Sequence, residues 1–249
     1  MRYDWIQADW PAPPNVRVVS TTRTGGVSHG PWSSFNLGLH GGDDPSHVEQ
    51  NRASLSTVLP APAHWLRQVH GTSVQRHVAG FTGEMEGDAL VSFEPRQVCA
   101  VLTADCLPVL FCNRQGDRVG IAHAGWRGLA NGILEATVRA LDEAPTQLMA
   151  WLGPAIGPQA YEVGADVVEA FPREFPAGFT ARGERFLMDI YALAKLKLAA
   201  VGVHAVYGGA YCTLSDPERF FSYRRDGVTG RMASLIWLDQ HESEIKKSA

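Results

Sequence analysis

The 249-residue sequence has few cysteines, no long apolar run and no block of like charges. Its four cysteines are scattered, which argues against a secreted disulfide framework and favours a reducing compartment. No segment approaches the roughly 20 apolar residues of a membrane span, and the first residues lack the apolar stretch of a signal peptide. We therefore place the protein in the cytoplasm and expect no membrane partner.

Charge is nearly balanced, since 22 Lys and Arg against 26 Asp and Glu give a net charge of −4. A nucleic-acid partner is not expected, because the basic patch or run that such a partner requires is missing. A small anionic substrate is compatible with this composition, because a few local arginines suffice to bind one. The sequence leaves the oligomeric state open.

Short apolar segments along the chain predict an α+β fold in one domain over residues 1–249. The length supports one large core, and no repeat or low-complexity linker marks a boundary. Few strand–helix–strand units alternate cleanly, so we expect mixed β-sheets in the middle with helices packed outside, a layered α/β/β/α arrangement. The predicted strands cover 16–20, 66–70, 73–78, 88–92, 98–102, 107–111, 118–123, 148–152, 203–207 and 232–238.

Four helices are predicted from capping residues and apolar spacing. The first is expected to begin with a capping box formed by Ser46 and Glu49 and to run to about Leu59. The others are predicted over 129–141, 163–171 and 189–201, the last capped by Asp189 and ended by Gly202.

Two histidines and one cysteine, His70, Cys106 and His123, each stand where an apolar segment ends in a turn or loop. Side chains at such positions can be aimed into a cleft by a rigid scaffold. Taken singly, a strand-end histidine is more often structural and a buried cysteine a small hydrophobe. The spacing matches no compact zinc signature, since neither C-x-x-C nor H-E-x-x-H occurs. We interpret the other three cysteines, Cys99, Cys112 and Cys212, as core residues.

Eight short segments carry a more specific signal. They are Thr22–Ser28, Phe35–Gly38, Gln68–Gly71, Thr103–Val109, His123–Gly128, Gly153–Gly157, Cys212–Thr213 and Phe221–Arg225. With these segments in this order, nearly the whole chain resembles the laccase-domain family, also called multicopper polyphenol oxidoreductases. That family includes purine nucleoside phosphorylases and the bacterial peptidoglycan editing factor.

The resemblance implies a zinc site formed by His70, Cys106 and His123 with one open position, which is a catalytic arrangement. Bound metal would keep Cys106 as a thiolate and lower the pKa of a bound water toward about 7. Asp105 is added to these three as a catalytic candidate that could orient a ligand histidine or carry protons. It could equally cap a turn.

Three arginines are the candidates for anion binding: Arg23, Arg224 and Arg225. Guanidinium groups suit phosphate oxygens, and the backbone N–H of Gly25 could add a donor beside Arg23. We include Asn36, from the segment Phe35–Gly38, in this predicted substrate- and phosphate-binding set. At least one arginine of the 224–225 pair could instead be a surface salt-bridge partner.

Aromatic residues could offer a face to a purine, and the candidates are Phe35, Trp126 and Tyr223. Aromatic residues in a chain of this size are also common in the core. Arg127 could stack on Trp126 or cap the turn beside it.

The family's laccase name implies oxidation of phenols with reduction of dioxygen. Ordinary multicopper oxidases hold several coppers largely through His-x-His pairs, and this sequence contains none. One copper could bind two imidazoles and a thiolate, but a lone copper cannot supply the electrons for full dioxygen reduction. We interpret copper binding as adventitious and zinc as the expected metal.

The leading hypothesis from the resemblance is a zinc-dependent purine nucleoside enzyme with nucleoside and phosphate as partners. It would phosphorolyse adenosine, inosine or methylthioadenosine by attack of phosphate on ribose C1′, and it would deaminate adenosine at C6.

Several alternatives remain open at this point. One is zinc-assisted amide hydrolysis of UDP-muramoyl cell-wall precursors, and another is a metal-free hydrolase with Cys106 as nucleophile and His70 or His123 as base. A laccase-like oxidase is a further alternative. The last is a non-enzymatic zinc protein, in which Asp88 or Cys112 would provide a fourth ligand.

Overall fold

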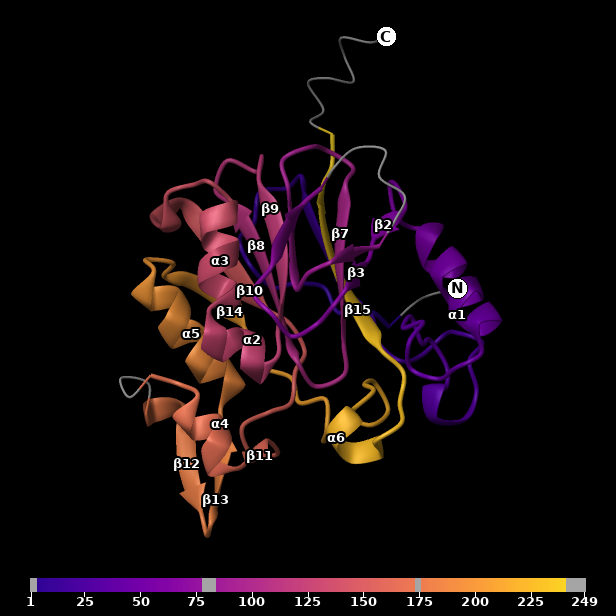
Figure 1. Ribbon diagram of the computed structural model, residues 1–249. Helices are drawn as coiled ribbons and strands as arrows, with labels where there is room; N and C mark the ends of the chain where they lie inside the picture. Colours follow the sequence, from indigo (N-terminus) through magenta and orange to yellow (C-terminus); the bar gives the residue numbers. More distant parts are fainter. Residues whose placement is uncertain (1–3, 78–83, 173–175, 241–249) are drawn as a thin grey trace.

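Two β-sheets stack face to face between two layers of helices (Figure 1). The computed structural model describes residues 4–77, 84–172 and 176–240. The four-stranded sheet has the order β1 (Val16–Ser20), β15 (Met232–Leu238), β7 (Val98–Thr103), β2 (Ala63–His64). The six-stranded sheet has the order β14 (Ala205–Gly208), β10 (Leu148–Leu152), β8 (Leu107–Asn113), β9 (Val119–Ala124), β6 (Ala89–Ser92), β4 (Val74–Arg76). The mixed α+β fold and its layered arrangement are confirmed.

The helices divide between the two outer faces (Figure 1). On the side of the four-stranded sheet lies α1 (Pro45–Ser56), and against the six-stranded sheet lie α2 (Trp126–Asn131), α3 (Ile133–Ala140) and α5 (Ile190–Ala200). The short elements are α4 (Ala165–Glu169), α6 (Tyr223–Asp226), the pair β3 (Leu66–Arg67) and β5 (Met85–Glu86), the sheet β11 (Glu162–Val163), β13 (Arg185–Met188), β12 (Phe179–Arg182), and three 3₁₀ turns, Gly30–Trp32, Pro145–Gln147 and Pro176–Gly178. None of the described helices is long and apolar enough to cross a bilayer.

Strand alternation explains the layering. In β15, Ala233 and Leu235 pack toward α1, whereas Ile236 packs into the core between the two sheets. In β8, Val109 faces the helices α2, α3 and α5, whereas Leu110 faces the other sheet. These strands therefore bury both faces, and this is why they read as nearly continuous apolar runs in the sequence.

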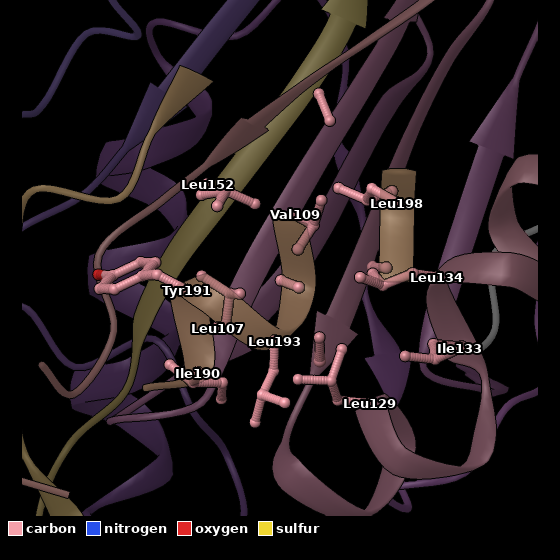
Figure 2. Packing of buried hydrophobic residues seen from close by; sticks show 14 of the residues in the cluster. Leu107, Val109, Leu129, Ile133, Leu134, Leu152, Ile190, Tyr191, Leu193 and Leu198 are labelled. Carbon is pink, nitrogen blue, oxygen red and sulfur yellow. The ribbon is translucent and has the colours of Figure 1, made fainter. Parts of the chain in front are cut away.

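Figure 2 shows the contact between the six-stranded sheet and its helices, where side chains of β8, α2, α3 and α5 gather into one cluster. Leu193 and Leu198 of α5 meet Leu107 of β8, Leu129 of α2 and Leu134 of α3 there. This packing fixes the ends of β8 and β9, from which two of the candidate metal ligands project.

Strands β1, β10 and β15 and the Asp189 cap of α5 are confirmed. The predicted capping box was wrong. Asp44 is the N-cap of α1, because its carboxylate accepts the N–H of Ser46, and the helix ends at Ser56 rather than Leu59.

Other boundaries also differ from the prediction. The helix predicted over 129–141 is two helices, α2 and α3, because Gly132 adopts φ 100° between them. The helix predicted over 163–171 contains only α4, since Val163 pairs in β11, and the hairpin β12–β13 was not predicted. Of the strand predicted over 73–78, β4 forms at Val74–Arg76, and residue 78 lies outside the described residues. Cys99 and Cys112 are buried as predicted, whereas Cys212 is partly exposed.

Candidate metal centre

His70, Cys106 and His123 converge, although 36 and 17 residues separate them in sequence. Their ligand atoms all lie within 4.8 Å of one another, and Cys106 Sγ is 3.9 Å from His70 Nε2. His70 follows β3, Cys106 stands in the turn from β7 to β8, and His123 is the penultimate residue of β9. The described residues contain no other group of three or more such side chains placed to hold a metal ion.

The geometry fits a divalent metal. Tetrahedral zinc with bonds of about 2.3 Å to sulfur and about 2.05 Å to nitrogen places these atoms about 3.6 Å apart, so the observed 3.9 Å needs only a small contraction. Gly125 allows this approach, because a Cβ there would lie 2.9 Å from His70 Cδ2 and 3.1 Å from Cys106 Sγ. Two imidazoles and a thiolate are ligands that zinc prefers.

Asp88 is the residue that organises the two histidines. One carboxylate oxygen accepts from His123 Nδ1 at 2.8 Å, which leaves Nε2 for a ligand. The same carboxylate accepts three consecutive backbone N–H groups, from Val69, His70 and Gly71, at 3.2, 2.9 and 2.7 Å. This wrapping explains the φ of 60° at His70, in the left-handed region, and why the predicted strand 66–70 ends at Arg67.

The electrostatics of the group favour the thiolate of Cys106, which is its metal-binding form, whereas His123 must lose a proton before it can bind a metal. Burial would raise the pKa of Cys106, but the charge of and the hydrogen bonds from His123 and His70 outweigh it and lower that pKa to about 6. Burial would lower the pKa of His123, but Cys106 and Asp88 raise it to about 9. Asp88 has its pKa held below the usual range by His123 and backbone N–H donors, despite burial. Without metal, therefore, Cys106 and His123 form a thiolate–imidazolium pair at neutral pH.

In metal-free protein, alkylation of Cys106 by iodoacetamide is expected to accelerate as pH rises through about 6, because the thiolate is the nucleophile and its pKa is lowered to about 6. Peptide mass spectrometry across about pH 5 to about pH 9 measures the rate, and added zinc should suppress it. Cys99 is the internal control, because burial raises its pKa and it should stay unmodified. A Cys106 midpoint at the pH of an ordinary thiol would contradict the pairing.

Asp105 organises the opposite side of the site. Its carboxylate accepts from Thr213 Oγ1 at 2.6 Å, Ser222 Oγ at 3.0 Å and the backbone N–H of Arg224 at 2.7 Å. The residue adopts φ 93°, and these bonds tie the turn that holds Cys106 to the start of α6. Asp88, not Asp105, bonds to a ligand histidine. The sequence had suggested Asp88 only as a fourth ligand, and neither it nor Cys112 belongs to the described metal-capable group.

The three ligands open into a cleft of about 350 Å³. Its walls come from the loop after the first strand, the ends of β3, β7 and β9, the start of α6 and the residue before β15. In Figure 1, α2 and α6 lie at the same end of the two sheets. The described lining residues are Gly38, Leu39, His40, Gly41, Leu66, Gln68, His70, Leu102, Thr103, Ala104, Cys106, His123, Tyr223 and Arg231.

Among the predicted aromatic contacts, the structure brings only Tyr223 into the described cleft wall, and this residue is 61% exposed. Phe35 is fully buried in the core beneath α1. Trp126 packs against the helix-side core, and Arg127 stacks on it at 4.4 Å.

The predicted anion-binding arginines lie outside the described cleft wall. Arg23 donates to the carbonyls of Ser33 and Pro217, and Arg225 pairs with Asp226 and donates to three backbone carbonyls. Arg224 donates to the carbonyl of Glu162 at 2.6 Å. Their phosphate-binding role stays a prediction.

Gly25 and Asn36, the other two predicted anion-site residues, also lie outside the described cleft wall. Gly25 adopts φ 92° in the loop after β1. The Asn36 side chain is buried and holds the backbone N–H groups of Gly38 and Arg231 at 3.0 and 2.8 Å, so it supports two cleft residues indirectly. Arg231 itself was missed, because nothing in its local sequence, next to a predicted strand, distinguishes it from an ordinary surface arginine.

With this geometry in place, comparison with known families is decisive. Residues 17–239 match the family described as multi-copper polyphenol oxidoreductase laccase. The chain belongs to that family. The resemblance inferred from the eight short segments is thereby confirmed.

Relatives and solved structures agree with this assignment. The chain is 52% identical over 238 residues to a protein of Escherichia coli K12 named purine nucleoside phosphorylase YfiH, covering 94% of this chain and 98% of that one. A Pseudomonas aeruginosa protein, named purine nucleoside phosphorylase PA4543, is 52% identical over 239 residues with the same coverage. The crystal structure of Neisseria meningitidis protein NMB0706 has a TM-score of 0.93 at 50% identity, covering 95% of this chain and 100% of that one.

Proposed function

We propose that this protein is a zinc-dependent purine nucleoside enzyme that phosphorolyses adenosine, inosine and methylthioadenosine and deaminates adenosine. The observation that carries the proposal is the convergence of His70, Cys106 and His123 at an open cleft. Relatives at 52% identity that are named purine nucleoside phosphorylases support the substrate class. The three ligands leave a position free for a reactant, as catalytic zinc sites do.

Each residue near the metal group has a separate part in this proposal. Zinc held by the two imidazoles and the thiolate would supply a Lewis acid to the reaction. Asp88 keeps the proton of His123 on Nδ1 and thereby presents Nε2 to the cleft. Asp105 acts as a positioning residue, because its hydrogen bonds hold the Cys106 turn against α6.

Tyr223 is proposed to cover the purine. It is the exposed aromatic residue of the described cleft wall, and it stands at the first position of α6, directly after Ser222, which bonds to Asp105. A planar ring on the wall of a cleft that also has apolar lining residues, such as Leu39 and Leu102, suits a heteroaromatic base. In phosphorolysis, a phosphate oxygen bonds to ribose C1′ while the C1′–N9 bond breaks, and the bond pair leaves with the base, which then takes up a proton.

A laccase-type reaction is not supported by this site. Full reduction of dioxygen needs four electrons, and the described residues offer one metal-capable group with three ligands. No His-x-His pair occurs in the sequence to hold further coppers.

The test is a nucleoside assay with metal-stripped and zinc-loaded protein. With adenosine and phosphate, loaded protein should release adenine and ribose 1-phosphate, and without phosphate it should form inosine, both resolved by chromatography. Chelation should stop both reactions and zinc should restore them. Absence of both products above a Cys106→Ala background would overturn the proposal, and release of an amino acid from a UDP-muramoyl conjugate instead would assign the site to amide hydrolysis.

A further inference from the structure

Arg231 is the one arginine in the described cleft wall, and the proposed function does not yet use it. It is placed directly before β15, at the end of the four-stranded sheet where β7 leads into the Cys106 turn. Burial lowers its pKa, whereas the nearby charges of Cys106, Asp105 and Tyr223 raise it. The guanidinium is therefore close enough to Cys106, one of the three candidate metal ligands, for their charges to interact.

The stem of Arg231 is held in place while part of its head is left free. Nη1 donates to the carbonyls of Thr229 and Gly230 at 2.9 and 3.0 Å, and the backbone N–H is held by Asn36 Oδ1. Gly38 leaves room for the stem, because a Cβ there would lie 2.7 Å from Arg231 Cγ. Within the described residues, Nε and Nη2 have no hydrogen-bond acceptor, so two adjacent donors remain for a ligand.

The cleft around these donors selects for negative charge. None of its described lining residues is an aspartate or glutamate, whereas Arg231 contributes a guanidinium. Glu84 lies outside the lining and faces His40 at 3.6 Å. A divalent metal bound to one thiolate and two neutral imidazoles leaves a net charge of +1, which adds to the arginine. Two parallel donors on a guanidinium match the oxygens of a phosphate.

We propose that Arg231 binds the phosphate co-substrate of phosphorolysis through Nε and Nη2, within reach of the metal group. This inference rests on the proposed function. It replaces Arg23 as the main anion contact, because the Arg23 Nε and Nη1 donors are used on backbone carbonyls away from the cleft. Its consequence is a separation of substrate sites, with phosphate at Arg231 and the base at Tyr223, two residues that both line the cleft.

Steady-state kinetics of zinc-loaded protein at varied phosphate tests the assignment. Arg231→Gln should raise the KM for phosphate about 10- to 100-fold, the range expected for losing hydrogen bonds to a charged group, while the KM for adenosine stays within about twofold. Arg231→Lys should raise the KM for phosphate less than Arg231→Gln does, because lysine keeps the positive charge but lacks the two parallel N–H donors of the guanidinium. Phosphate-independent deamination of adenosine should change little, since that reaction has no phosphate to bind. Arg17→Gln is the control, because this exposed arginine pairs with Asp239 outside the described cleft wall and its loss should leave the KM for phosphate near wild type.

A binding measurement keeps this inference separate from the proposed function. Titration calorimetry or ³¹P line broadening with inorganic phosphate should detect binding to zinc-loaded wild type and its loss in Arg231→Gln, even if no nucleoside is turned over. If nucleoside turnover fails but this difference appears, the proposed function falls and the anion site stands. An unchanged KM and unchanged binding in Arg231→Gln would overturn the inference. Weakened binding of AMP with unchanged binding of inorganic phosphate in Arg231→Gln would also overturn it, by assigning the arginine to a phosphate ester.

Discussion

Replacing Cys106 with alanine is expected to remove nucleoside turnover and tight zinc binding together. The thiolate is one of three converging ligands, and its pKa of about 6 makes it available at neutral pH without competition from protons. Removing a residue that only hydrogen-bonds to a metal ligand typically lowers metal affinity or activity about 10- to 100-fold. Removing the ligand itself should therefore lower kcat/KM by more than about 100-fold. Metal content by atomic emission and turnover of adenosine with phosphate measure the two effects.

A second substitution separates a metal ligand from a nucleophile. Cys106→Asp offers a carboxylate oxygen that zinc accepts at a similar distance, but it cannot replace a cysteine nucleophile. Partial activity that follows zinc occupancy in Cys106→Asp is therefore expected. Cys212→Ser is the control, because Cys212 is a partly exposed thiol outside the described cleft wall and should keep wild-type activity. Turnover in metal-stripped wild type, abolished by Cys106→Asp, would identify a metal-free cysteine hydrolase instead.

The ligand trio could be predicted from sequence only through the resemblance to a known family. His70 and Cys106 are 36 residues apart, and the segment that carries His70 is placed by the pairing of β3 with β5 and by two hydrogen bonds that pair the Gln68 side chain with the backbone of Leu102. No local signal specifies those long-range pairings. Arg231 illustrates the same limit, since its cleft position follows from Asn36, 195 residues earlier.

The fold was predictable where one property decided the local structure. Apolar strands such as β10 and the Asp189 cap of α5 were found because burial on both faces and an N-terminal carboxylate leave clear patterns. The helix over 129–141 was misjudged, because Gly132 breaks it through a backbone angle of 100° that apolar spacing does not reveal. The strand after Leu66 was also overextended, because residues 69–71 bond to Asp88 rather than to a neighbouring strand.

Substitution of Asp88 is expected to have the largest effect on stability. The carboxylate is fully buried and holds His123 Nδ1 and three backbone N–H groups. Asp88→Ala leaves all four donors without an acceptor, which should lower the free energy of unfolding by about 3–5 kcal/mol, the cost of breaking a buried ion pair. Urea denaturation of metal-free protein measures this change. Asp117→Ala is the control, because that carboxylate is exposed and a comparable loss there would show that the effect is not specific to the metal centre.

Asp88→Asn then distinguishes support of the loop from control of His123. Asparagine keeps one oxygen, which can still accept from the N–H groups of Val69 and Gly71, so the stability loss should be smaller than in the alanine variant. With its amide facing His123, it would donate to Nδ1 and move the histidine's proton to Nε2, the atom that the metal needs. Zinc affinity should therefore fall about 10- to 100-fold while the fold survives. Zinc affinity within twofold of wild type would show that the metal centre does not depend on the protonation of His123 set by Asp88.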